Sequence, residues 1–162
     1  MPAPAIERFV ALAEGLGVDV TVSEFPEGTR TAVDAAAAVG CDVDAIVKSL
    51  VFVADGGPVL VLVSGGGRVD ERLLATMLGA TTVRKADADE ARAATGYAIG
   101  GTPPFGHTGD GVDTVLIDPA LLEHDTVWAA AGTPSAVFPI APALLAEAAR
   151  ARVVDVTEVR SA

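Results

Sequence analysis

The sequence predicts a mixed α/β fold in which helices flank a mostly antiparallel β-sheet. Segments with helical spacing of apolar residues alternate with short β-rich segments along the chain. Several β-rich segments are joined by connections too short for the crossover between parallel neighbours, which argues against a purely parallel sheet. The 162 residues contain no repeat and no break in composition, so one domain is expected over residues 1–162.

The first elements are expected to be a helix, a strand and a second helix. Apolar residues at helical spacing start the chain, at Ile6, Phe9, Val10 and Ala13. This helix should end near Gly15 or Gly17. A short strand is expected over residues 18–25. The alanine-rich residues 29–39 predict a helix that Gly40 ends, with Cys41 just beyond it.

A β-hairpin is predicted for the middle of the sheet. Residues 46–54 and 58–64 are β-rich, and the intervening Asp55-Gly56-Gly57 favours a tight turn. Asp70 can then cap a helix that ends at Gly79. Asp87 and Glu90 have capping-box spacing for another helix, which Gly96 ends.

The last third predicts further short strands and one helix. A strand is expected over residues 114–117, and Asp118-Pro119 reads as a helix cap followed by proline at the first helical position. Strands are expected over residues 126–130 and 136–140. Pro142 should open a final helix that runs through Arg150, and residues 153–156 can add an edge strand.

Composition limits the classes of partner. A formal net charge of −11, from 22 acidic and 11 basic residues, argues against broad electrostatic binding of DNA or RNA. RNA binding would have to be local and salt-sensitive. No apolar run approaches the roughly 20 residues of a membrane span, and no leader pattern is evident, so we expect a cytoplasmic protein without membrane contact. One cysteine and two histidines cannot build a four-ligand zinc site, so no metal is expected.

Lys48 is the most informative side chain. It lies within the strand-like sequence Ile46-Val47-Lys48-Ser49-Leu50-Val51-Phe52-Val53, which is otherwise almost entirely apolar. By alternation it shares a face with Ile46, Leu50 and Phe52. Its ammonium must reach water, pair with an acid, or line a cleft that receives an anionic ligand. The residues alone leave these interpretations open, because lysines also protect strand edges.

The second candidate region is the loop Gly100-Gly101-Thr102-Pro103-Pro104-Phe105-Gly106-His107. Its glycines allow a ligand close to the backbone, and N–H groups of Gly100, Gly101 or Thr102 could stabilise an oxyanion. An ordinary surface turn explains the same composition. His107 could move a proton at neutral pH or could simply be solvated or hydrogen-bonded.

Several common catalytic motifs are absent from the sequence. It has no G-x-S-x-G, no H-E-x-x-H and no G-x-x-x-x-G-K-[ST], and Gly65-Gly66-Gly67 does not continue into G-x-G-x-x-G. We therefore expect no nucleotide cofactor. Any hydrolysis would depend on positioning and backbone polarisation rather than on a covalent triad.

Five segments in order resemble the YbaK/prolyl-tRNA-synthetase-associated editing-domain family. They are Ile46-Val47-Lys48-Ser49-Leu50, Thr95-Gly96-Tyr97, Gly100 to Gly106, Ile117-Asp118 and Ala131-Gly132, within a similarity that runs from about residue 23 to 145. The resemblance implies hydrolysis of the ester between a mis-selected amino acid and tRNA, without a cofactor. It implies Lys48, Gly100 and Gly101 as catalytic residues, with Lys48 on phosphate or ribose. The substrate-binding residues that it implies are Thr102, Pro103, Pro104, His107, Ala130 and Gly132.

The expected function is a trans-acting deacylase for a small amino acid on tRNA(Pro) or a related tRNA. The chain has Ala130-Ala131-Gly132 where relatives that act on Cys-tRNA(Pro) often have Ser-Ala-Gly, so alanine, cysteine, serine or a related small amino acid all stay open. The expected partner is the 3′ acceptor end of aminoacyl-tRNA, and whether a synthetase also takes part is open. A non-catalytic module that binds an acceptor end or a small ligand is the alternative, and an interaction domain without a cleft is the third.

Overall fold

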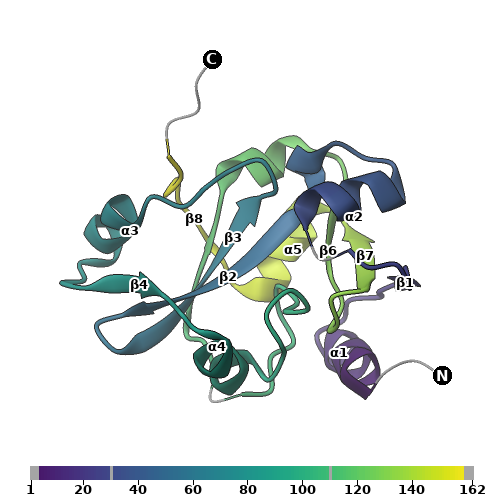
Figure 1. Cartoon of the computed structure of the whole chain (residues 1–162), viewed down its shortest axis with the longest axis horizontal. Helices are drawn as coiled ribbons and strands as arrows, with labels where there is room; N and C mark the ends of the chain where they lie inside the picture. The colour runs from purple at the N-terminus through teal and green to yellow at the C-terminus, as the bar shows by residue number, and fades with distance from the viewer. Residues whose placement is uncertain (1–3, 30, 110, 159–162) are drawn as a thin grey trace.

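The computed structural model describes residues 4–29, 31–109 and 111–158 and has the predicted mixed α/β architecture (Figure 1). The strands form two sheets, where the sequence predicted one. The elements in chain order are α1 (Pro4–Gly15), β1 (Ser23–Glu24), α2 (Ala32–Val39), η1 (Val43–Ala45), β2 (Val47–Ala54), β3 (Gly57–Ser64), α3 (Glu71–Leu78), β4 (Val83–Lys85), α4 (Ala88–Thr95), β5 (Thr114–Ile117), η2 (Pro119–Glu123), β6 (Val127–Ala130), β7 (Ala136–Ile140), α5 (Pro142–Ala149) and β8 (Arg152–Val153).

The larger sheet is built around the predicted hairpin. Its strand order is β4-β2-β3-β5-β8, with β2 antiparallel to both β3 and β4. Asp55 and Gly56 form the turn with φ of 48° and 85°, and positive φ at both central residues is the turn geometry that Asp-Gly favours. Strand β5 pairs in parallel with β3 and with β8, so the sheet is mixed. The central position predicted for the hairpin is confirmed.

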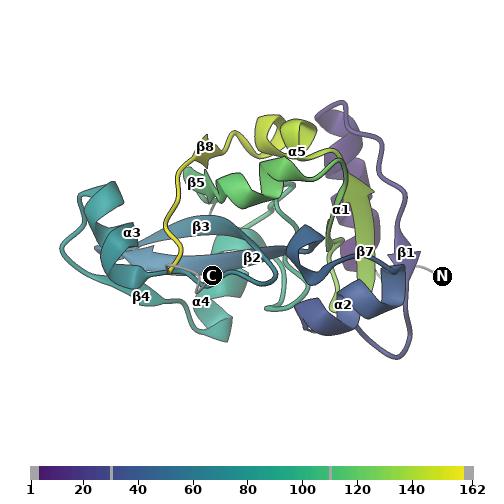
Figure 2. The ribbon, with the colours of Figure 1, turned by 90° about the horizontal axis from the view of Figure 1, so that it is seen from above.

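The smaller sheet has the order β1-β7-β6 and is antiparallel. It lies with α1 and α2 at one end of the molecule, whereas α3 and β4 lie at the other end (Figures 1 and 2). The two sheets meet where Ile46, just before β2, forms a parallel bridge with Trp128 of β6. The start of β2 therefore contacts the smaller sheet, and the junction at Ile46 and Trp128 borders the candidate site.

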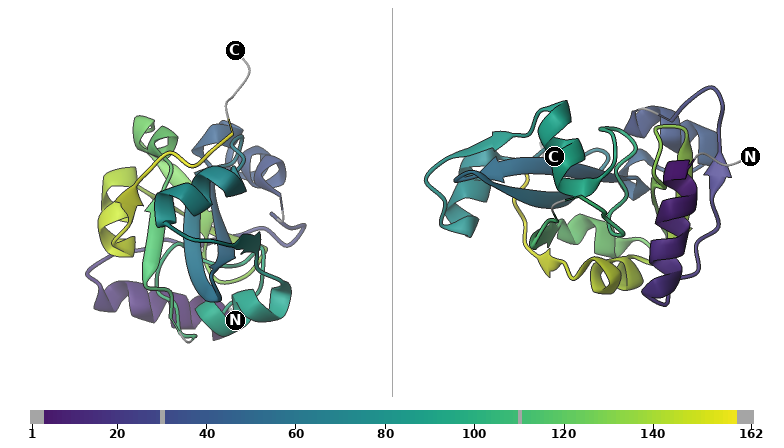
Figure 3. Two further views of the ribbon diagram at one scale, coloured as in Figure 1. Left: turned by 90° about the vertical axis from the view of Figure 1, so that its left-hand side faces the viewer. Right: turned by 90° about the horizontal axis from the view of Figure 1, so that it is seen from below.

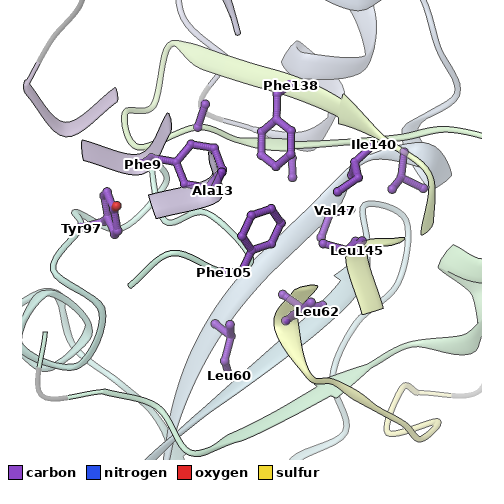
Figure 4. Close-up of a cluster of buried hydrophobic side chains, with 14 of the residues drawn as sticks. Phe9, Ala13, Val47, Leu60, Leu62, Tyr97, Phe105, Phe138, Ile140 and Leu145 are labelled. Carbon is purple, nitrogen blue, oxygen red and sulfur yellow. The ribbon is translucent and has the colours of Figure 1, made fainter. Parts of the chain in front are cut away.

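An aromatic cluster holds the smaller sheet against α1 and the loop after α4. Phe9 of α1 lies 5.0 Å from Phe138 of β7 and 5.5 Å from Phe105, measured between ring centroids (Figure 4). All three side chains are buried. The loop between α4 and β5 lies between α4 and α1 (Figures 1 and 3). Phe105 thus anchors the candidate loop of residues 100–107 in the core.

Most predicted helix ends are confirmed, and their caps explain them. Thr31 accepts a hydrogen bond from the Asp34 N–H, and Asp70 accepts from the N–H groups of residues 72 and 73. Asp87 and Glu90 form the reciprocal capping box. The glycines that follow α2, α3 and α4 all adopt the left-handed conformation that ends a helix.

Three strands differ most from the sequence prediction. The strand expected over residues 18–25 is only Ser23–Glu24, because the backbone leaving α1 stays with the helix end, where the Val18 N–H donates to Ala13 O. Strand β4 was not predicted, since three residues carry too little pattern. The last strand is Arg152–Val153 and not residues 153–156.

Acid stability should depend on Glu90. Arg84 donates two hydrogen bonds of 2.7 Å to this carboxylate, and with the Asp87 N–H it lowers the pKa of Glu90 from 4.5 to about 2. A folded pKa below the unfolded one stabilises the fold above about pH 4.5, and this contribution disappears as the pH falls towards 2. In urea unfolding from pH 7 to pH 2, Glu90→Gln should be less stable than wild type at pH 7 and should lose less stability on acidification. A parallel acid dependence in both proteins would contradict this.

Candidate functional site

A cavity of about 460 Å³ opens at the junction of the two sheets. Its walls come from the β2 edge, α2, the segment 99–102, the end of β4 and the β6–β7 pair. On the edge of β2 that faces away from β3, strand β4 pairs only with Phe52 to Ala54. Within the described residues, the earlier part of this edge pairs with no strand and borders the cavity. Segments more than 50 residues apart in sequence thus share one hollow.

Lys48 lines this cavity from β2. Its side chain is half-buried, and the Nζ donates a hydrogen bond of 2.6 Å to the carbonyl of Gly67. Leu50 and Phe52, which alternation places on the same face as Lys48, pack in one cluster with α3. The ammonium is therefore held next to the glycine-rich segment after β3, at one side of the cavity.

The glycines after β3 are explained by close packing. A Cβ on Gly65 would collide with the carbonyl of Val43, and one on Gly66 would collide with the carboxylate of Asp44. Only glycine allows this segment to lie against η1. The tight approach also places the Gly67 carbonyl where Lys48 reaches it.

The loop after α4 contributes to the cavity lining two residues whose backbone N–H groups are unbonded within the described chain. Gly100, with φ of 87°, and Thr102 both line it. Within the described part of the chain, neither the Gly100 N–H nor the Thr102 N–H has a hydrogen-bond partner. The Gly101 N–H differs, since it donates to Ala98 O at 3.0 Å. The expectation that Gly101 offers a free donor is therefore wrong, because the turn itself uses that group.

Gly101 has a packing role in this loop. Its carbonyl accepts from the Gly132 N–H at 3.0 Å, and a Cβ on Gly101 would lie 2.7 Å from Thr133 Cα. Gly132 in turn lies against α1, because a Cβ there would lie 2.8 Å from Ala5 O. Neither glycine lines the cavity, and together they hold the loop against the end of the smaller sheet. Ala130, two residues earlier, does line the cavity.

Pro103, Pro104 and His107 lie outside the cavity lining. The two prolines are buried. The His107 Nε2 lies 2.8 Å from Pro103 O, and the ring packs edge-on against Tyr97. Burial lowers the pKa of His107, against the opposing effect of the Pro103 carbonyl, and so favours the neutral ring. The structure thus places His107 as a brace for the loop and does not bring it into the cavity.

The structure adds two polar residues that sequence reasoning missed. Lys85, at the end of β4, is exposed, lines the cavity and forms no ion pair with any described residue. Lys48 and Lys85 are the two lysines of the sequence, and both line the same cavity. Because the sequence has so few lysines, Lys85 could have been singled out from the sequence as a second candidate site residue. Ser49 also lines the cavity, and nothing in its sequence context distinguished it.

Neither a metal-binding cluster nor a membrane-spanning helix occurs among the described residues. They contain no cluster of three or more His, Cys, Asp or Glu side chains that could hold a metal ion. None of their helices has the length and apolarity of a membrane span. The polar groups of the residues that line the cavity include the two lysine ammonium groups, the hydroxyls of Ser49 and three threonines, and backbone amides.

Comparison with known proteins points to one family. A family model described as an aminoacyl-tRNA editing domain matches residues 26–148. A solved structure described as a candidate trans-editing enzyme for prolyl tRNA synthetase superimposes with a TM-score of 0.91. It is 41% identical in sequence, and the match covers 98% of this chain and 100% of that chain.

Two curated relatives extend the comparison. The proline–tRNA ligase of Nitratidesulfovibrio vulgaris (strain DP4) is 38% identical over 101 residues, which are 62% of this chain and 17% of the ligase. The chain thus corresponds to a small part of that enzyme's length. The uncharacterized protein YwhH of Bacillus subtilis (strain 168) is 31% identical over 127 residues, which are 78% of this chain and 79% of YwhH.

Proposed function

The chain belongs to the aminoacyl-tRNA editing-domain family, and we propose that it is a trans-acting deacylase that hydrolyses the ester between a small amino acid and tRNA. One observation carries the proposal: Lys48, Gly100 and Thr102 line the same cavity, and the N–H groups of Gly100 and Thr102 have no hydrogen-bond partner among the described residues. A cation for the nucleotide and donors for the ester carbonyl are the two functions that such a site needs.

The ester would be cleaved by water. As water attacks the carbonyl carbon, negative charge develops on the carbonyl oxygen, and the N–H groups of Gly100 and Thr102 are suited to stabilise it. The bond between the carbonyl carbon and the ribose oxygen then breaks. The departing ribose oxygen takes up the proton that the attacking water gives up, so the products are the free amino acid and a ribose hydroxyl. An aminoacyl ester is already activated, so positioning and backbone donors can suffice without a covalent nucleophile.

The two lysines would hold the acceptor end. Lys48, fixed beside Gly67, would contact the terminal ribose or phosphate, and the exposed Lys85 would add a second positive charge at the other side. Two local cations suit a chain whose net charge of −11 repels RNA elsewhere. Binding should therefore be confined to the acceptor end and should weaken as salt increases.

The similarity to proline–tRNA ligases and to a candidate trans-editing enzyme supports tRNA(Pro) as the substrate RNA. The cavity walls contain several small side chains, including Ala86, Ala91, Ala129 and Ala130, which suits a small aminoacyl group. Delivery of the substrate by prolyl-tRNA synthetase is the partner relation that these similarities support.

A deacylation panel tests this function. tRNA(Pro) charged separately with alanine, serine, cysteine and proline is incubated with purified protein, and release of the amino acid is followed over spontaneous hydrolysis. We expect rapid release of at least one non-cognate amino acid and little release of proline. Saturable tRNA binding without release of any amino acid would refute the enzyme and support the binding module.

A further inference from the structure

We propose that Ser49 makes this cavity selective for an amino acid with a hydroxyl side chain, with the seryl ester preferred over the alanyl ester. The assignment rests on the proposed function, because it specifies which aminoacyl group the same site accepts. It is carried by one unsatisfied hydroxyl in the cavity wall.

Ser49 lies on β2 between Lys48 and Leu50, and its side chain is on the opposite face from theirs. Val47 and Val51 share its face and are buried in the main core, as is Leu62, which pairs with Ser49 across the hairpin. The Ser49 Oγ is buried and has no hydrogen-bond partner among the described residues. A buried hydroxyl without a partner is costly and rare in native proteins, so it calls for an explanation.

The other hydroxyls that line the cavity are already bonded. Thr29 Oγ1 donates to Pro134 O at 2.7 Å, and Thr102 Oγ1 donates to Ala98 O at 3.1 Å. Thr31 Oγ1 accepts from the Asp34 N–H at 3.0 Å as the α2 cap. Among the lining hydroxyls, Ser49 Oγ is thus the one that is buried without a hydrogen-bond partner among the described residues.

The surroundings of Ser49 determine which ligand group would satisfy it. Val47 and Val51, which share its strand face and also line the cavity, are aliphatic, so they offer no competing hydrogen bond. Rotation about the single χ1 bond moves the Oγ between three staggered positions. A seryl hydroxyl could then exchange a hydrogen bond with the Ser49 Oγ, whereas an alanyl methyl group would leave it unpaired. A site that pairs with a substrate hydroxyl discriminates against the analogue without one.

The test compares kcat/KM for Ser-tRNA(Pro) and Ala-tRNA(Pro) in wild type and in Ser49→Ala. We expect wild type to favour the seryl ester, and we expect Ser49→Ala to lower the seryl-to-alanyl ratio by about 10-fold or more. The variant should unfold at a temperature no lower than wild type, because it loses an unsatisfied hydroxyl. Ser49→Cys, which keeps the shape but bonds weakly, should give an intermediate ratio.

Ser64→Ala is the matched control from the neighbouring strand. The Ser64 Oγ is buried but bonded to Asp44 O at 2.8 Å, so its loss should lower the unfolding temperature and leave the seryl-to-alanyl ratio unchanged. An alanyl preference in wild type, or an unchanged ratio in both Ser49 variants, would overturn the assignment while the deacylase proposal stands. Absence of turnover on every ester would instead overturn the proposed function and the assignment together.

Discussion

Lys48→Ala is expected to lower kcat/KM for deacylation by about 100-fold or more, the range seen when one preorganised charged or donor group is removed from an active site. Lys48 is the cation that the structure holds in place at the cavity, through its bond to Gly67 O. Without it the acceptor end would lose the contact that aligns the ester with the Gly100 and Thr102 donors. Steady-state kinetics on the best substrate of the panel measures the loss.

The controls separate charge from position. Lys48→Arg keeps the charge but not the compact ammonium that reaches Gly67, so it should recover only part of the activity. Arg72→Ala removes one positive charge from exposed α3, outside the cavity, and should leave kcat/KM within about twofold of wild type. Near-normal turnover by Lys48→Ala, with an intact fold shown by circular dichroism, would refute the role of Lys48.

Gly101→Ala should have the second largest effect on deacylation, and it should lower activity by displacing the loop backbone. The added Cβ would lie 2.7 Å from Thr133 Cα and 2.8 Å from the Thr133 carbonyl carbon, so backbone must move. Overpacking of this kind costs about 1–3 kcal/mol of folding free energy. Because Gly100 and Thr102 flank this residue, a shift of about 1 Å would also misplace their N–H groups and could lower activity about 100-fold.

Two other glycines provide the comparison. Gly15 at the end of α1 has open space around its Cβ position and no positive φ, so Gly15→Ala should be close to neutral. Gly100 also has room but has φ of 87°, so Gly100→Ala should cost about 1–2 kcal/mol through backbone strain alone. Urea unfolding and deacylation kinetics on the three variants give the ranking. Equal stability of Gly101→Ala and Gly15→Ala would contradict the packing argument.

Local chemistry made much of the fold predictable. Asp55-Gly56 specified a hairpin turn through positive φ, and Asp87 with Glu90 specified a helix start through reciprocal capping. These signals act over a few residues and survive in any tertiary context. Strand β4 escaped prediction because it is a three-residue edge whose pairing partner, β2, lies about 30 residues earlier in the chain.

The candidate site was only partly predictable. Lys48 was conspicuous because a cation inside an apolar strand requires an explanation, and the glycine-rich loop marked a region of close approach. Gly101 was assigned the wrong contribution, since the bond from its N–H to Ala98 O depends on how the loop folds back. His107 was expected among the substrate-binding residues, yet its place beside Pro103 lies outside the cavity lining.

By itself, the sequence determined the helix caps, the central hairpin, the family and the prominence of Lys48, because each depends on residue types at short and regular spacing. Only the tertiary structure decided that two sheets meet at Ile46 and Trp128, that both lysines line one cavity, and that the Ser49 hydroxyl is left unpaired there. Those features depend on contacts between segments far apart in the chain, and the burial and hydrogen-bond partners of a side chain exist only once such segments have packed.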